Sequence, residues 1–331
     1  MARARPAWQP GVVHPPLPLA VPVGRSARRP DWSGLPVAVR ARLEDELGTR
    51  VVEARSQDSG FTPGFASRLR LADGRRVFVK AANDSRDWLI TSYRKEATKR
   101  SLLPDAVPAP RLQQVIDEPL GGEGWVLLVF DDVEGRPPGR PWLPAEARSA
   151  LRTAAGLAEA LTPPPSGWGW GTLADVLFDA PPDRAGLGDP PGWGGHLHDL
   201  AALAEQRTEL LAGNTLGHAD LRDDNLIIAA DGGVWVCDWN WPSVGPRWAD
   251  AVSLAVSMYG DGLDADALLA ETGLLGEDDR EAVDCLLAAL TRYCLLWSAR
   301  PANPTSPYLR AHQIWYAEAA GAWLRQRRGW R

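Results

Sequence analysis

The segment from Leu216 to Asn240 constrains the fold of this chain more than any other segment. Two short apolar runs, residues 226–228 and 234–237, flank the dipeptide Asp231-Gly232. An Asp-Gly pair between two such runs is typical of a tight turn joining antiparallel strands. The segment therefore predicts a β-hairpin.

The open end of this hairpin carries two oxygen-bearing side chains. If the strands pair symmetrically about Asp231-Gly232, Leu226 faces Cys237 and Asn225 faces Asp238. An amide oxygen and a carboxylate then emerge side by side, and these are ligands that a hard cation such as magnesium prefers. The hairpin thus predicts a magnesium site at Asn225 and Asp238.

A third acidic residue lies just upstream of this site. Asp220 precedes Asn225 by five residues, so a tight loop directs its carboxylate toward the same small volume. The residues from His218 to Asn225 read H-A-D-L-R-D-D-N, which matches the kinase loop H-x-D-x-x-x-x-N at every fixed position. With Asp238-Trp239 after the second strand, the segment resembles the aminoglycoside phosphotransferase family of protein-kinase-like small-molecule kinases.

The resemblance implies a role for each polar residue of the loop. Asp220 would orient the substrate hydroxyl or accept its proton, and His218 would brace the loop from behind. Asn225 and Asp238 would ligate magnesium.

Arg222 has no fixed counterpart in the family, whose members often carry a smaller or different residue there. It either approaches the γ-phosphate or pairs with Asp223 or Asp224. Chance is the alternative for the whole segment, since acids flanking an Asp-Gly turn are usually solvated.

A strand-rich region upstream gives an independent signal. Residues 51–55, 66–71 and 76–80 read as three strands, and the last of them ends in Lys80. In kinases the third strand delivers a lysine to the α- and β-phosphates, and a glutamate on the next helix orients it. Glu96, in the helix expected over residues 88–103, is the matching candidate.

Two further readings concern this region. Glu96 is flanked by Lys95 and Lys99, so pairing on the helix surface is the alternative for its carboxylate. The loop between the first two strands contains small and flexible residues that would let backbone N–H groups approach phosphates. These candidates are Ser59, Gly60, Thr62, Gly64 and Ser67. A plain surface loop is the alternative.

A buried strand over residues 125–130 then enters a short acidic segment and a proline-rich exit. This arrangement resembles the hinge between kinase lobes. By that analogy the carbonyl of Asp131 and the amide of Val133 would bind the adenine edge.

The rest of the chain is expected to be mainly helical. Helices are predicted over 144–161 and 197–211, with a Pro-, Gly- and Trp-rich insert at 163–195 that is either a substrate lid or a surface excursion. The resemblance implies that Asp250 anchors the catalytic segment and caps a helix. The acidic stretch 261–279 would suit an amine-bearing substrate, or is simply a solvated face.

Composition narrows the functional classes. The net charge of −6 and the pI of about 5.5 argue against a general nucleic-acid binder. The isolated cysteines 237, 285 and 294 read as reduced core residues. No run of 18 apolar residues occurs, and prolines interrupt residues 12–23, so neither a membrane span nor a signal peptide is expected. We therefore expect a cytoplasmic protein.

These signals together predict an α+β fold with two lobes. Residues 1–30 form a flexible Pro/Arg-rich arm, 31–132 a small β-rich lobe that binds the nucleotide, and 133–331 a larger, mainly helical lobe. The resemblance, over about residues 50 to 260, implies a magnesium-dependent ATP or GTP phosphotransferase acting on a small-molecule hydroxyl. The acceptor could be an aminoglycoside or another antibiotic, in which case the enzyme would have a role in antibiotic resistance.

Three rivals remain open at this stage. A kinase of a natural product or primary metabolite, such as a sugar, nucleoside or amino alcohol, would use the same residues. A protein kinase would need a longer activation segment than the 11 residues between Asp238 and Asp250. A nucleotide-binding pseudokinase should have lost one of Asp220, Asn225 and Asp238, and all three are present.

Overall fold

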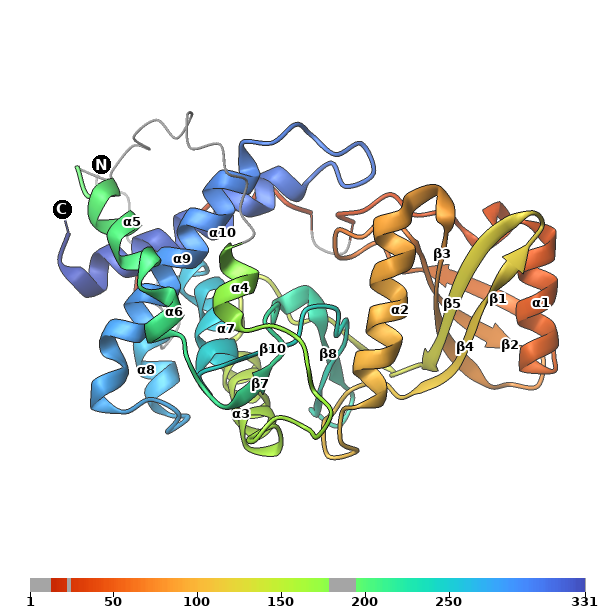
Figure 1. The fold of residues 1–331 in the computed structure, drawn as a ribbon, viewed down its shortest axis with the longest axis horizontal. Helices are drawn as coiled ribbons and strands as arrows, with labels where there is room; N and C mark the ends of the chain where they lie inside the picture. Colours follow the sequence, from red (N-terminus) through yellow and green to blue (C-terminus); the bar gives the residue numbers. More distant parts are fainter. Residues whose placement is uncertain (1–12, 23–24, 179–194, 331) are drawn as a thin grey trace, which may run out of the picture.

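The computed structural model describes residues 13–22, 25–178 and 195–330 of the chain. It consists of a small lobe built on one antiparallel sheet and a larger, mainly helical lobe, which confirms the predicted α+β class (Figure 1). Of the predicted arm, residues 1–12 and 23–24 lie outside the described part. The expected lobe limit at residue 132 falls between the last sheet strand and the short strand that follows it.

The small lobe contains five strands and two longer helices. These are α1 (Val37–Leu47), β1 (Val51–Ser56), β2 (Phe65–Leu71), β3 (Arg76–Asn83), α2 (Asp87–Ser101), β4 (Leu112–Leu120) and β5 (Glu123–Asp131). The strands pair in the order β1-β2-β3-β5-β4. Helix α1 packs on one face of the sheet, and α2 packs on the face toward the large lobe (Figure 1).

Strand β3 shows how the alternating pattern positions a polar side chain. Val77, Val79 and Ala81 belong to the core shared with α1, and all are almost fully buried. Because successive strand residues point to opposite faces, Lys80 projects toward α2 and the large lobe. The strand continues three residues beyond Lys80, to Asn83, so Lys80 lies inside the strand and not at its end.

The sequence patterns did not predict β4. Only Ile116 among its nine residues is buried, because β4 is an edge strand that pairs with β5 alone. Its sequence, LQQVIDEPL, places Gln113-Gln114, Val115-Ile116 and Asp117-Glu118 as like pairs and contains a proline, so it lacks the apolar alternation that marks a half-buried strand.

The described part of the large lobe contains helices and five short strands. Its elements are β6 (Gly135–Arg136), α3 (Pro144–Ala160), α4 (Leu173–Phe178), α5 (Leu197–Glu205), α6 (Arg207–Leu210), β7 (Thr215–Gly217), β8 (Leu226–Ala229), β9 (Val234–Val236), β10 (Ser243–Gly245), α7 (Ala249–Gly260), α8 (Ala265–Ala270), α9 (Arg280–Ser298) and α10 (Leu309–Arg328). Strand β8 pairs with both β6 and β9, and β7 pairs with β10.

Helix α7 lies at the centre of the large lobe. Every one of its residues is buried, and α3, α8, α9 and α10 pack around it. The single helix predicted over 197–211 is instead two helices, α5 and α6, that meet at Gln206. The predicted irregular insert contains α4, and its residues 179–194 lie outside the described part. Among the described helices, none combines the length and apolar character needed to cross a membrane.

The predicted hairpin is present, but the strand register predicted from the sequence was wrong by one residue. Leu226 pairs with Val236, and the Cys237 amide donates to the Asn225 carbonyl at 3.0 Å. The turn has three residues, not two, because the Ala229 amide bonds to the Gly233 carbonyl and Gly232 takes the left-handed conformation at φ +84°. A glycine in that position is typical of three-residue hairpin loops.

A buried ion pair fixes the segment after β6 to the end of α7. Arg140 donates to the two carboxylate oxygens of Asp261 at 2.6 and 2.9 Å, and both side chains are about 95% buried, with exposed fractions of 5% and 4%. Arg140 also lies 3.0 Å from the Asp223 carboxylate. The pair therefore supports the loop that contains Asp223.

Asp261→Ala should lower the free energy of unfolding by about 3–5 kcal/mol, because it leaves the Arg140 cation buried with only one carboxylate. Glu271→Ala is the matched control, since Glu271 and Arg148 form an exposed pair and such pairs contribute less than about 1 kcal/mol. Urea unfolding followed by circular dichroism measures both. Equal small losses would contradict the structural role given to Asp261.

Candidate active site

A carboxylate from α7 holds the loop between β7 and β8. Asp250 accepts hydrogen bonds from the backbone amides of His218 and Ala219 at 2.6 and 2.9 Å. Ala219 has the left-handed φ of +60°, which is uncommon for a residue with a side chain. Asp250 thus anchors this backbone, but it does not cap α7, because it lies inside the helix and Trp248 is the capping residue.

His218 joins this loop to the segment after β9. Its ring is fully buried, accepts from the Asp220 amide at Nδ1, and bonds to the Cys237 carbonyl through Nε2 at 3.0 Å. An amide donor at Nδ1 and a carbonyl acceptor at Nε2 assign the tautomer with the proton on Nε2. The buried ring of Trp239 packs edge-on against His218, with 4.8 Å between centroids.

Lys80 lies between two carboxylates that come from different lobes. Its ammonium is 2.6 Å from Glu96 Oε1 on α2 and 2.6 Å from Asp238 Oδ1 after β9. The surface pairing of Glu96 with Lys99 does not occur, because Glu96 is buried and Lys99 donates to the carbonyl of Asn240. The structure therefore brings together three of the residues singled out in the sequence.

Asp238 reaches this position despite the shifted hairpin register. Its backbone is left-handed, with φ +68°, so the chain turns sharply at the end of β9. The side-chain amide nitrogen of Asn240 donates to Asp238 Oδ1 at 2.6 Å. The side-chain oxygen of Asn240 in turn accepts a hydrogen bond from the hydroxyl of Ser92 on α2. Asn240 belongs to none of the motifs recognised in the sequence. Its place two residues after Asp238 is the only signal.

The electrostatics of this group follow from burial and charge. Burial opposes the charge on Lys80, but Asp238 and Glu96 outweigh it and raise the pKa of Lys80 above its usual value. Burial likewise favours neutral Asp238, but Lys80 outweighs it and lowers the pKa of Asp238 to about 2. Burial raises the pKa of Glu96, although Lys80 opposes the rise. Asp238 is thus the carboxylate that stays ionised most firmly.

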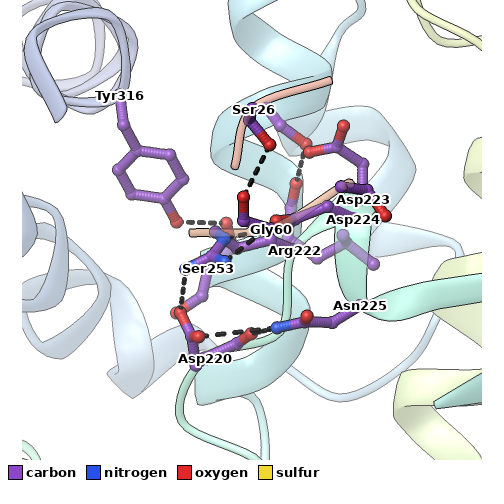
Figure 2. Close-up of polar contacts among 12 residues, drawn as sticks. Ser26, Gly60, Asp220, Arg222, Asp223, Asp224, Asn225, Ser253 and Tyr316 are labelled. Carbon is purple, nitrogen blue, oxygen red and sulfur yellow. Dashed lines mark hydrogen bonds and ion pairs between the residues drawn. The ribbon is translucent and has the colours of Figure 1, made fainter. Parts of the chain in front are cut away.

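Arg222 binds two carboxylates of the loop (Figure 2). Its guanidinium lies 2.6 Å from Asp220 Oδ1 and makes a bidentate contact with Asp224 at 2.9 and 3.0 Å. Of the pairings considered from the sequence, the one with Asp224 occurs, whereas Asp223 binds Arg140. Burial raises the pKa of Asp220, and the Arg222 charge opposes this rise.

Asn225 and Asp238 carry the oxygen atoms that suit a hard cation. The Asn225 amide nitrogen donates to the Asp220 carbonyl at 2.8 Å, which leaves its oxygen as the atom available to a metal (Figure 2). Within the described residues, no group of three or more His, Cys, Asp or Glu side chains forms a ready-made metal site. Magnesium commonly takes one or two protein ligands and completes its shell with phosphates and water, so this pair fits it.

The loop between β1 and β2 covers this region. Gly60 has a left-handed φ of +79°, and Phe61 packs its ring 5.6 Å from the Arg222 guanidinium. Thr62 and Gly64 complete the loop, and a Cβ on Gly64 would collide with the Tyr93 hydroxyl, so only glycine fits there. The carbonyl of Ser59 accepts a hydrogen bond from Arg29 at 2.9 Å. Arg29 lies far in the sequence from every recognised motif and was not predicted as a site residue.

Ser67 was wrongly grouped with this loop. It lies within β2 opposite Val79, is 1% exposed, and points toward the α1 side of the sheet. Because opposed residues in antiparallel strands share a face, Ser67 cannot reach the side on which Lys80 lies.

The two hinge candidates lie where the lobes meet. Asp131 is the last residue of β5, and its amide bonds to the Arg111 carbonyl at 2.9 Å. Val133 follows in the short segment before β6 and is partly buried. Their roles toward adenine stay predictions.

Comparisons with known proteins give one family match and several similar folds. The sequence profile described as the phosphotransferase enzyme family matches residues 61–286. No curated protein sequence matches the chain.

Similar solved structures include choline kinase LicA from Streptococcus pneumoniae, with a TM-score of 0.57 and 12% identity over 86% of this chain and 98% of that chain. A thermostable mutant of aminoglycoside phosphotransferase APH(4)-Ia, with ADP and hygromycin B, has a TM-score of 0.55 and 14% identity over 87% and 98%. APH(2")-IIia with GDP and kanamycin has a TM-score of 0.56 and 15% identity over 89% and 99%. At such low identity these likenesses show the fold alone, and they confirm that it is protein-kinase-like.

Asp250→Asn should lower the free energy of unfolding by about 2 kcal/mol, because an amide oxygen cannot replace a carboxylate toward two backbone donors. Asp278→Asn removes the same charge from an exposed residue and should change stability by less than about 0.5 kcal/mol. Urea unfolding measures both variants. If the two substitutions cost the same, Asp250 is not the anchor of the loop.

The stabilising effect of ionised Asp238 should depend on pH with a definite sign. Its folded-state pKa of about 2 lies below the unfolded value of about 3.9, so the stabilisation is complete above about pH 5 and is lost as pH falls toward 2. The difference in unfolding free energy between wild type and Asp238→Asn should be constant from pH 7 to 5 and shrink below pH 4. A difference that does not change between pH 5 and 3 would contradict this.

Proposed function

Since the chain belongs to the phosphotransferase enzyme family, we propose that it transfers the γ-phosphoryl group of ATP or GTP to a hydroxyl group of a small molecule. The observation that carries this proposal is the Lys80 ammonium held by Glu96 and Asp238, next to a loop that presents Asp220. Known structures of this fold contain ADP or GDP beside a small-molecule acceptor, which supports a nucleotide at the corresponding place here.

Each residue has one task in this proposal. Lys80 binds the α- and β-phosphates, and Glu96 keeps its ammonium oriented. Asn225 and Asp238 would hold magnesium, which neutralises charge on the transferring phosphoryl group when bound. The chain itself supplies the ionised carboxylate, because Lys80 keeps the pKa of Asp238 low.

Asp220 would orient the acceptor hydroxyl and take its proton. Burial raises its pKa, which makes the carboxylate a better base near neutral pH. Arg222 touches Asp220 directly, so its charge lies close to the place where the phosphoryl group would pass. We propose that Arg222 shares its charge between Asp220 and the γ-phosphate.

The acceptor is constrained less than the donor. The acids of the 261–279 stretch mostly have partners within the chain: Asp261 binds Arg140, Asp266 binds Arg327, Glu271 binds Arg148, and Asp264 caps α8. This stretch therefore gives no argument for an amine-bearing acceptor. The acceptor remains either an antibiotic, as in the hygromycin and kanamycin complexes, or a metabolite such as an amino alcohol, as the similarity to a choline kinase suggests.

The three free cysteines agree with a reducing compartment, and we propose that the enzyme acts in the cytoplasm.

Incubation of the full chain with magnesium, ATP or GTP, and a panel of aminoglycosides, other antibiotics, sugars, nucleosides and amino alcohols tests the proposal. Mass spectrometry should detect an acceptor that has gained one phosphoryl group. Asp220→Asn should slow its formation at least 100-fold, about the contribution of a positioned base, while Asp231→Asn, at the exposed hairpin turn, should react like the wild type.

Nucleotide binding without any phosphorylated product would favour the pseudokinase reading. Full turnover by Asp220→Asn would remove Asp220 from its proposed role. An absence of nucleotide binding would overturn the proposal.

A further inference from the structure

The amino-terminal segment of the chain runs along the large lobe and ends at the loop that covers the candidate site. The amides of Val13 and Leu17 donate to the carbonyls of Gly262 and Gly260, both at 2.7 Å. The described residues 25–30 then lie against the β1–β2 loop. This segment precedes the part of the chain that the family profile matches, residues 61–286.

Three hydrogen bonds from two adjacent residues attach this segment to the β1–β2 loop. The amides of Ser26 and Ala27 both donate to the carbonyl of Asp58 at 2.9 Å. The Ser26 hydroxyl donates to the carbonyl of Gly60 at 2.6 Å (Figure 2). The segment is also held from the large lobe, because the Arg28 amide donates to the carbonyl of Thr305 at 2.8 Å. Residues 26–28, directly before Arg29, are therefore bound both to the β1–β2 loop and to the large lobe.

The guanidinium of Arg29 bridges the two ends of the β1–β2 loop. One terminal nitrogen donates to the carbonyl of Ser59 at 2.9 Å, and the other donates to the carbonyl of Gly64 at 3.3 Å. These residues lie five positions apart, so the side chain closes the loop from outside. An arginine suits this task because its nitrogens have a fixed planar geometry.

The β1–β2 loop lies between Arg29 and the loop of residues 218–225, which carries Asp220. A Cβ built on Gly60 would be 3.4 Å from the Arg29 guanidinium and 3.8 Å from Asp224. Asp224 is in turn bound to Arg222, which contacts Asp220. Arg29 is thus separated from the proposed site of phosphoryl transfer by a single layer of backbone.

Arg29 also differs from the other arginines of the site in its partners. Within the described residues, both partners of its guanidinium are neutral carbonyl oxygens, whereas Arg140 and Arg222 each bind carboxylates. Two of its five N–H donors are used, so its positive charge is available to an anion near the loop.

We propose that Arg29 positions the nucleotide's phosphates, both by fixing the β1–β2 loop over them and by placing a positive charge at that loop. This inference rests on the proposed function, since it requires that a nucleoside triphosphate binds beside Lys80. It gives the amino-terminal segment a role in donor binding. Substitution of Arg29 should therefore weaken binding more for ligands with more phosphate groups. Binding of the nucleoside alone should not change.

A series of ligands that differ only in phosphate number tests this directly. Isothermal titration calorimetry gives Kd values for ATP, ADP, AMP and adenosine, all with magnesium, for the full-length wild type, Arg29→Gln and Arg28→Gln. Arg29→Gln should raise the Kd of ATP at least about tenfold, because a charge-assisted contact is lost, and should leave the Kd of adenosine unchanged. Arg28→Gln removes an exposed neighbouring charge and should match the wild type for all four ligands.

Arg29→Lys separates the bridge from the charge. Lysine keeps the positive charge but cannot donate to the carbonyls of Ser59 and Gly64 at the same time with a planar group. The Kd of this variant for ATP should therefore lie between those of the wild type and Arg29→Gln. An equal loss for adenosine and ATP in Arg29→Gln, or no loss for ATP, would overturn the inference while the proposed function stands. An absence of ATP binding by the wild type would overturn the proposed function, and this inference with it.

Discussion

The ammonium group of Lys80 joins the two lobes of the molecule. It binds Glu96 on α2 of the small lobe and Asp238 of the large lobe, although Lys80 and Asp238 lie 158 positions apart in the sequence. The three groups depend on one another, because an unpaired charge at this depth would be costly. The pair of contacts fixes the position of α2 relative to the hairpin β8–β9, and so defines the volume in which we propose that the phosphates bind.

A second network holds the loop of residues 218–225, which carries the proposed base, beside this volume without any charged group of the small lobe. Asp250 binds two successive amides, and His218 carries the constraint onward to the Cys237 carbonyl, one residue before Asp238. The proposed base Asp220 and the proposed metal ligand Asp238 are therefore attached to the same buried core. Their relative position does not rely on the flexible ends of long side chains.

Much of this site was predictable because its residues lie in short, ordered motifs. The spacing from His218 to Asn225 predicted the loop, and the order of third strand, lysine and following helix pointed to Lys80 and Glu96. The hairpin register was not predictable, because an Asp-Gly pair fits a two-residue and a three-residue loop equally well and only the structure places Gly232. Arg29 was missed because a contact between distant segments leaves no local pattern, and β4 because an edge strand buries almost nothing.

The most direct test of the account is a crystal structure of the protein with magnesium and a non-hydrolysable ATP analogue. In that structure Lys80 should keep its bond to Glu96 and exchange Asp238 for phosphate oxygens, so that Asp238 and Asn225 bind the metal. A nucleotide bound elsewhere, or bound without any contact to Lys80, would contradict it.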